Sequence, residues 1–383
     1  MATAGPAVPP ESMRRTASAR RLDYVQYLRI ALIGLVVAHH AGQAYGPTGG
    51  AWPVRDPGSM ALLRAFFAVN AAFFMGLFFL ISGYFVAGPL ARQGPSAYAK
   101  GRLVRLGIPL VAMMFGVFWP LAWAGYHGPL GALPFFVQTY VTNGSAAVGH
   151  MWFVANLLVF TLAYVAWRAW RGAARTPPDP PLPGHGAMLA YAVMLGLVSA
   201  LVRVRYPVDH WVTWLVPSEL AHLPQYVSLF ALGIVASYGE WFNRLPRRIG
   251  FAWLAIGVGA ALAFYLCAIV GGPPGLIATG GWQLGNLVWS LWEAFICVGL
   301  CVGLVVAFRE YLDRPSARFG AFAENTFAVY VVHVPIIVVL QGMLLRAALP
   351  VAVKFLLVTA VGAVLSFRLA TRLRRSATVR RVL

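Results

Sequence analysis

Two residues that could do chemistry, Arg29 and His40, lie in the first long apolar stretch of the chain, residues 24–45. They are eleven positions apart. In an α-helix this spacing is about three turns plus 20°, so both would lie on one face, about 16 Å apart along the axis. Histidine exchanges protons near neutral pH, and arginine binds anions. The spacing therefore predicts a functional stripe on one helix, with His40 and Arg29 as candidate catalytic residues.

Ionisable residues also interrupt two later apolar stretches, with Glu293 in residues 284–308 and His333 in residues 322–343. A charge inside a membrane helix is costly and usually faces a bundle interior or a wet cavity. We therefore expect both side chains to line the same cavity as Arg29 and His40 and to bind substrate. For any one of these residues the alternative is a structural role as a buried, paired group.

Four more candidate substrate contacts lie at the ends of apolar stretches. His150 and Trp152 open one stretch, and Ser82 and Tyr84 close another that reads FFLISGYF. A tryptophan at such a depth is typical of the membrane interface, and a histidine two residues earlier is placed to line an outer vestibule. The Ser-Gly pair permits close helix approach, and the G-x-S-x-G elbow is absent, so we do not expect Ser82 to be a nucleophile.

Two arginines, Arg102 and Arg105, enter the third apolar stretch in the segment RLVRLGIP. Residues three apart face the same side of a helical turn, and arginine forks bind phosphate through two hydrogen bonds. The alternative is a topology signal beside a membrane span. Because the loops contain neither a Walker loop nor G-x-G-x-x-G, these two arginines are the candidate site for a phosphate-bearing cofactor.

No metal is expected, because the histidines of the apolar stretches show no metal-ligand spacing. They are His39, His40, His150 and His333. The three cysteines all lie in apolar stretches, where we expect them to be packing residues. They are Cys267, Cys297 and Cys301.

The composition is that of a membrane protein. Of the 383 residues 60% are hydrophobic and 11% charged, with a mean hydropathy of +0.72. Soluble domains contain about 25% charged residues. The net charge of +19 lies in short clusters between apolar stretches, which favours topology signals and anionic lipid head groups over nucleic acid as its explanation.

Ten stretches are long and apolar enough to cross a bilayer as helices, which predicts an all-α polytopic membrane protein. They are Val25–Ala44, Ala61–Val86, Leu106–Trp123, Met151–Trp170, Ala187–Val202, Leu220–Tyr238, Phe251–Val270, Leu284–Phe308, Phe322–Met343 and Val351–Leu369.

Arginine-rich and arginine-poor connections alternate along the chain, with Arg203 and Arg205 as the exception. The positive-inside rule then places both termini in the cytoplasm. We expect a disordered cytoplasmic tail at residues 1–22, a transmembrane domain at 23–371 and a basic cytoplasmic tail at 372–383.

With these motifs in hand, the chain resembles the acyltransferase family 3 membrane proteins. Within the family it is most similar to the branch of the glucan biosynthesis protein C, which transfers succinyl groups to periplasmic glucans. The matching pieces occur in the family order along nearly the whole chain. They are Arg29 with His40, FFLISGYF at 78–85, RLVRLGIP at 102–109, GHMWFV at 149–154 and ENTFAVYVVHVPI at 324–336.

The resemblance implies transfer of an acetyl or succinyl group from cytoplasmic acetyl-CoA or succinyl-CoA to a hydroxyl of a carbohydrate or glycan at the outer side of a bacterial inner membrane. It implies roles for Arg29 and His40, for Arg102 and Arg105 on acyl-CoA, and for His333. It also implies that His40 is a general base or a covalent acyl carrier.

The chain departs from the family pattern at Gln26, where an acidic residue is usual. Two other functions remain open: a transporter or flippase of an anionic or lipid-linked solute, and acylation of a small intracellular metabolite by a protein of the same family.

Overall fold

The computed structural model describes residues 22–47, 52–124, 128–142, 148–172, 179–213, 216–271 and 278–383. Within them the chain is almost entirely helical, and ten segments are long and apolar enough to cross a membrane. The prediction of an all-α polytopic membrane protein is confirmed. The tail predicted at residues 1–22 lies, apart from Leu22, outside the described residues.

The ten spans cover the predicted stretches, with shifted ends. They run over Asp23–Gly42, Leu63–Gln93, Pro95–Trp123, Gly149–Arg171, His185–Arg205, Leu220–Tyr238, Arg247–Val270, Leu284–Leu312, Phe322–Leu344 and Val351–Leu373. The α-helices are α2 (Asp23–Gly42), α3 (Leu63–Tyr84), α4 (Ala87–Gln93), α5 (Pro95–Arg102), α6 (Ile108–Met113), α7 (Trp119–Ala124), α8 (Ala132–Phe136), α9 (Trp152–Arg171), α10 (His185–Arg205), α11 (Leu223–Tyr238), α12 (Trp241–Arg244), α13 (Arg247–Val270), α14 (Leu284–Leu312), α15 (Ala317–Leu344), α16 (Val351–Leu373) and α17 (Ala377–Val382). The shorter elements are η1 (Leu103–Gly107), η2 (Met114–Phe118), η3 (Val137–Thr142), η4 (Gly149–Met151), η5 (Leu220–His222), β1 (Trp211–Thr213) and β2 (Pro217–Glu219).

The third span begins at Pro95, whereas the sequence predicted a start at Leu106. Gly94 has a positive φ of 79°, and Pro95 follows it in the first helical turn, where its missing N–H is not needed. A π-helical turn, η1, begins directly after Arg102. Arg102 and Arg105 therefore belong to the helical span itself rather than to the loop before it.

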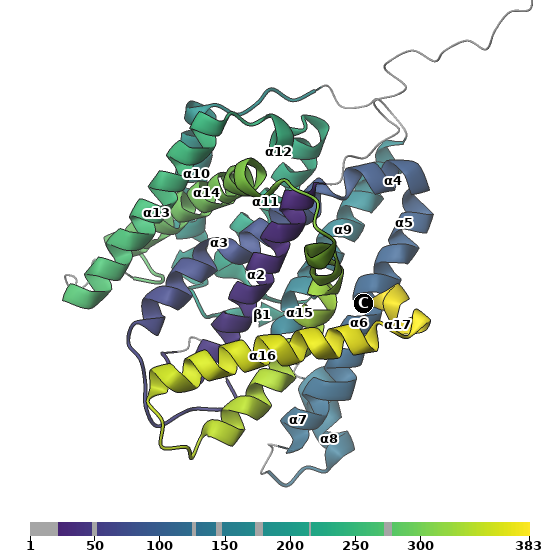
Figure 1. Ribbon diagram of the computed structural model, residues 1–383, viewed down its shortest axis with the longest axis vertical. Helices are drawn as coiled ribbons and strands as arrows, with labels where there is room; N and C mark the ends of the chain where they lie inside the picture. The colour runs from purple at the N-terminus through teal and green to yellow at the C-terminus, as the bar shows by residue number, and fades with distance from the viewer. Residues whose placement is uncertain are drawn as a thin grey trace, which may run out of the picture.

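Helix α2 packs against α3, α14, α15 and α16. Figure 1 shows α2 near the middle of the view, with α16 crossing it. Tyr24, Val25 and Leu28 of α2 are fully buried. Arg29 and His40 are both half-buried, so neighbouring parts of the protein cover each of them in part.

The backbones of α3 and α11 approach each other closely at two glycines, Gly83 and Gly233. A Cβ atom added to Gly83 would collide with the carbonyl oxygen of Phe230, and one added to Gly233 would collide with that of Leu80. Small residues permit such approach between membrane helices, and the gain is van der Waals contact along both helices. This contact holds α3 in place beside α2.

The segment between α2 and α3 folds back onto the end of α2. Asp56 accepts from Lys354 of α16 at 2.7 Å, and both side chains are buried. Trp52 Nε1 donates to Gln341 Oε1 of α15 at 2.8 Å. Removing one partner of a buried ion pair is strongly destabilising, because the other charge is then left unpaired. These two contacts therefore tie the segment to α15 and α16 over the last turn of α2.

Candidate active site

Three histidines from distant parts of the chain meet where α2 ends and α9 begins, which we call the histidine end of the bundle. They are His40 of α2, His150 of η4 and His333 of α15. The ring centroid of His333 lies 4.9 Å from that of His40 and 4.8 Å from that of His150, and the rings of His40 and His150 are 6.0 Å apart. The structure thus brings together three residues that the sequence singled out separately.

Hydrogen bonds to carbonyl groups indicate which ring nitrogens carry protons. His333 Nδ1 lies 2.7 Å from the Tyr330 carbonyl, and His40 Nδ1 lies 3.0 Å from the Val36 carbonyl. Because a carbonyl only accepts, both Nδ1 atoms donate, and in the neutral rings both Nε2 atoms carry the lone pair. His333 Nε2 lies 3.1 Å from His40 Nδ1, so it accepts from the same proton. His40 Nε2 is thereby left as a base.

His150 is bound to α15 through the backbone. Its Nε2 donates to the Tyr330 carbonyl at 2.8 Å, and the Tyr330 hydroxyl donates back to the His150 carbonyl. Pro335 has no N–H, so the Val331 carbonyl loses its helical donor, and this carbonyl also contacts the His150 ring. His150 Nδ1 is buried and has no hydrogen-bond partner among the described residues, which leaves an acceptor nitrogen for a ligand.

Accessibility differs among the three histidines. His333 and His150 are buried, at 0% and 6% exposure, whereas His40 is half-buried. The Trp52 ring lies 5.6 Å from the His40 ring, and Gln341 donates to the carbonyls of His40 and Ala41. Of the three histidines, His40 is therefore the most exposed, and the Trp52 ring lies beside it.

Arginines gather where α2 begins and α16 ends, which we call the arginine end. Arg29 donates to Gln26 Oε1 at 3.4 Å, a neutral partner, and it interacts electrostatically with Arg105. Arg105 also interacts with Arg102 and Arg374. Arg102 lies over the Tyr98 ring at 4.8 Å. A bound anion would stabilise such a concentration of positive charge. In addition, Arg105 lies in a π-helical turn, a distortion of the α-helix that is common at functional sites.

Glu293 lies in a separate ion network and contacts none of the three clustered histidines in the described part of the chain. It pairs with Arg203 of α10 and lies 3.4 Å from His222 Nε2. Arg203 also donates to Ser290 Oγ at 3.1 Å. All four side chains are buried. The expected common cavity with His40 is not formed, because Glu293 is turned toward α10 and η5, which carry its charged partners.

The ion network reaches the loop before η5 through Glu219, whose carboxylate lies 3.0 Å from His222 Nδ1. Burial alone would raise the pKa of Glu219, but the charge and hydrogen bond of His222 and the N–H of Asp209 hold it below its ordinary value. Burial raises the pKa of Asp209, and the nearby Glu219 carboxylate adds to the increase. The network thus pairs two carboxylates, Glu219 and Glu293, with two cationic partners, Arg203 and His222, as a structural ion cluster does.

The remaining predicted contacts divide between the two ends. Trp152 lies two residues after His150 at the histidine end, and its ring lies 5.6 Å from that of Trp211 and 5.4 Å from that of Tyr226. Tyr84 stacks on Phe242 at 4.0 Å at the far end of α3. Ser82 lies in the same last turn. The structure therefore places Trp152 at the histidine end, packed against Trp211 and Tyr226, and leaves Ser82 and Tyr84 away from that end.

Four residues of the site were missed in the sequence: Trp52, Tyr330, Gln341 and Lys354. Tyr330 and Gln341 could have been predicted, because they lie one turn before and about two turns after His333 on the same helix. Lys354 stood out as a lone cation in an apolar stretch. Trp52 could not have been predicted, because it lies between two helices, where the sequence has no helical periodicity that would relate it to His40.

The described residues contain no group of three or more histidine, cysteine or carboxylate side chains with the geometry of a metal site. The donors at the histidine end already bind backbone carbonyls or one another. Three histidines meet at this end, and histidine is the side chain suited to proton transfer near neutral pH.

Comparison with known proteins gives one family. The model of a family described as an acyltransferase domain matches residues 22–371. Proteins named Glucans biosynthesis protein C from Salmonella schwarzengrund (strain CVM19633) and Salmonella typhi are 24% identical over 349 residues, covering 83% of this chain and 83% of theirs. No solved structure matches the chain. Because the family model spans nearly the whole chain, the chain belongs to the acyltransferase 3 family of membrane proteins.

Proposed function

We propose that this acyltransferase moves an acetyl or succinyl group from acyl-CoA to a hydroxyl of a glycan. The observation that carries the proposal is the contact of His333 Nε2 with His40 Nδ1 at 3.1 Å. It holds His40 with Nε2 unprotonated in a half-buried position beside the Trp52 ring. General acid–base catalysis needs a base in this state within reach of a hydroxyl.

The donor binds at the arginine end. Arg102, Arg105 and Arg29 supply the charge for the phosphates of acyl-CoA, and arginine is the side chain best suited to phosphate. Arg29 lies about 16 Å below His40 along α2, a rise comparable to an extended pantetheine arm. The arm then runs along α2 and presents the thioester to His40. This arrangement explains why Arg29 and His40 share a face without touching one reacting carbon.

In the reaction, His40 Nε2 takes the proton of the acceptor hydroxyl as the hydroxyl oxygen attacks the thioester carbonyl. The carbon–sulfur bond breaks, and the departing thiolate takes up the proton to give CoA thiol. During the step His40 is cationic, and the Val36 carbonyl and the His333 lone pair stabilise the proton on Nδ1. A covalent acyl-His40 would use the same nitrogen and would give ping-pong kinetics.

The acceptor binds at the histidine end. His150 Nδ1 is a buried acceptor without a partner among the described residues, and the Trp52 ring lies beside His40. Trp152, two residues after His150, adds a second aromatic ring to this end of the bundle, in contact with Trp211 and Tyr226. Aromatic rings with a few polar groups are a common lining for small-molecule sites. The relatives are named for glucan biosynthesis, which supports a glucan as the acceptor here.

The bacterial origin of the relatives and the arginine distribution support a multi-pass position in the bacterial inner membrane, with both termini in the cytoplasm. The arginine end then faces cytoplasmic acyl-CoA, and the histidine end faces the outer side.

The test is product analysis with purified protein in nanodiscs. Acetyl-CoA or succinyl-CoA is supplied with and without a linear glucan, and CoA thiol and glucan esters are measured. We expect thiol release and ester formation to rise together with one donor. Substituting Arg102→Gln with Arg105→Gln raises the KM for the donor, and the matched control, Arg247→Gln with Arg248→Gln, does not. Solute uptake into liposomes without thiol release would overturn the proposal in favour of a transporter.

A further inference from the structure

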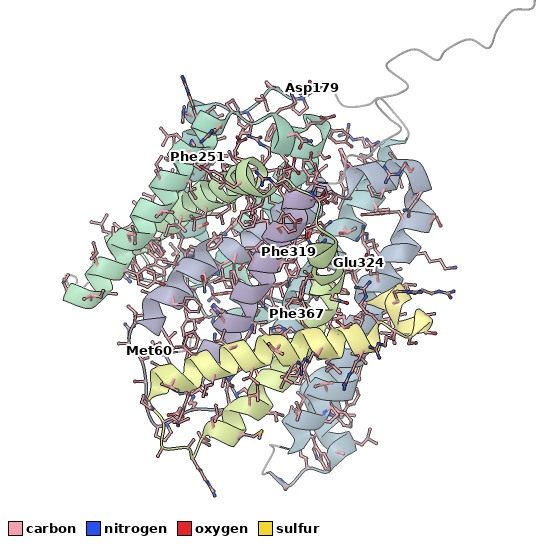
Figure 2. The ribbon with its side chains drawn as sticks, in the orientation of Figure 1. Met60, Asp179, Phe251, Phe319, Glu324 and Phe367 are labelled. Atoms are coloured by element: carbon pink, nitrogen blue, oxygen red, sulfur yellow. The ribbon has the colours of Figure 1, made fainter. Side chains whose placement is uncertain are left out.

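A groove of about 360 Å³ between α15 and α16 is lined by three arginines that the proposed function does not use. Arg368, Arg372 and Arg375 lie along one side, and Phe322 of α15 and Phe367 of α16 pack edge to face with ring centroids 5.3 Å apart. Phe367 and the adjoining part of α15 can be followed in Figure 2. The lining of the groove therefore combines two packed aromatic rings with three arginine side chains.

The three arginines continue an apolar stripe on α16. Leu357, Val361 and Leu365 are exposed, and Arg368 and Arg372 follow at spacings of three and four residues. These spacings place all of them on one helical face. The exposed face of α16 thus changes from apolar to cationic along its length, as a helix does where it passes from hydrocarbon to head groups.

The arginines of the groove are not neutralised by the protein. Arg368, Arg372 and Arg375 form no ion pair with any acid among the described residues. The nearest acid on α15, Glu324, pairs instead with Arg374 at 3.8 Å. Arg374, which follows the last residue of α16, also donates to Asn325 Oδ1 and does not line the groove. The arginines assigned to acyl-CoA, Arg29, Arg102 and Arg105, do not line it either.

We propose that this groove binds the phosphate head group of an anionic phospholipid, with its acyl chains along the exposed apolar stripe of α16. Arginine forks bind phosphate oxygens, and cations at the membrane surface attract anionic lipids. The continuity of the apolar stripe with the cations selects a lipid over a free phosphate, because both parts of the surface are then covered by one molecule.

The test uses the full-length protein in nanodiscs of equal amounts of phosphatidylcholine and phosphatidylglycerol. The protein is extracted in detergent, and retained lipids are counted by native mass spectrometry. We expect wild type to retain phosphatidylglycerol preferentially. The variant with Arg368→Gln, Arg372→Gln and Arg375→Gln should retain at least about fivefold less phosphatidylglycerol than wild type. A fivefold change corresponds to the loss of about one arginine contact at the membrane surface.

The control removes three exposed arginines at other span ends, through Arg171→Gln, Arg247→Gln and Arg248→Gln, and should retain the lipid as wild type does. Equal retention by the groove variant and wild type, or equal loss in both variants, would overturn the proposal. Displacement of the lipid by added CoA would assign the groove to the coenzyme instead. If the triple variant does not fold, Arg372→Gln alone provides the same comparison.

Discussion

At the scale of single residues, the chemistry depends on which ring nitrogens carry protons. His40 and His333 each donate from Nδ1 to a carbonyl of their own helix, one turn earlier in the chain. This leaves the Nε2 atom of His333 to accept from His40, as a carboxylate does in a catalytic triad. A neutral histidine in this role adds no charge to a site that must also accept a neutral hydroxyl.

We predict that His333→Gln lowers kcat roughly 100-fold, because His40 loses the group that orients its ring and stabilises its proton. The loss should not add to that of His40→Gln in the double variant, since the two residues act as a unit. The matched control is His185→Gln, which replaces an exposed histidine at the start of α10 and should leave kcat unchanged. Additive losses in steady-state kinetics would show that His333 acts independently of His40.

A second prediction concerns Glu293. Replacing it by glutamine leaves Arg203 as a buried cation without its acid, so we expect the free energy of unfolding to fall by about 3–5 kcal/mol. Glu310→Gln, which removes a half-exposed partner of Arg309, should cost less than about 1 kcal/mol. Unfolding in detergent followed by circular dichroism measures both. A stable Glu293→Gln protein with a raised KM for the acceptor would restore the substrate-binding role expected from the sequence.

The individual site residues were predictable where helical spacing carries information. Arg29 and His40 share a helix, so their common face followed from their separation. The meeting of His150 with His333 depends on contacts between segments about 180 residues apart, which no local pattern encodes. The partners of Glu293 were not predictable, because the sequence pattern of an intramembrane carboxylate is the same whether it faces a substrate or an arginine. Its pairing with Arg203 depends on the packing of α10 against α14, and its substrate-binding role stays a prediction.

At the scale of elements, the position of α3 beside α2 depends on the contact of α3 with α11. Gly233 is the critical residue, because the carbonyl oxygen of Leu80 occupies the space a side chain would need. His39 packs against three phenylalanines of α3, so a displaced α3 would also displace the end of α2. The packing of α3 against α11 is thus connected to the position of His40, which follows His39 directly.

We predict that Gly233→Ala lowers the free energy of unfolding by about 1–3 kcal/mol, as overpacking does in a well-packed core. The new Cβ would also lie 2.8 Å from the Tyr84 nitrogen, so the two helices must separate. Gly259→Ala on α13 is the control, since nothing lies within 4 Å of its Cβ and its stability should not fall. The midpoint of thermal unfolding in detergent distinguishes them, and equal midpoints would contradict the close-packing role of Gly233.

Element boundaries were predicted less well than element number. Hydropathy gave ten spans, and the structure has ten such segments in its described ranges. The start of the third span was missed because Lys100, Arg102 and Arg105 make its first turns polar, although Pro95 and Gly94 mark a helix start. A helix that carries a ligand-binding cluster in its first turns is therefore read as a loop by hydropathy alone.

At the scale of the whole molecule, the two clusters lie at opposite ends of one helix. Arginines gather at one end of α2 and histidines at the other. Figure 1 shows how α15 and α16 pack beside α2. In the function that we propose, this layout lets the acyl group cross the membrane on the pantetheine arm while the nucleotide part of the donor stays at the arginine end.

We therefore predict sidedness. Inverted membrane vesicles should consume acyl-CoA added outside them, because the arginine end then faces the added donor. Right-side-out vesicles should consume it only after permeabilisation. CoA-thiol release measured on both preparations tests this, with protein content matched between them. Equal rates in intact vesicles of both kinds would contradict separate ends for donor and acceptor.

The most direct test of the catalytic role of His40 compares His40→Gln with wild type in one preparation, measuring acyl transfer and acyl-CoA binding together. We predict that kcat falls at least about 100-fold while donor affinity is unchanged, because His40 Nε2 is the base and the arginine end is intact. Full transfer activity in folded His40→Gln protein would contradict catalysis by the histidine cluster.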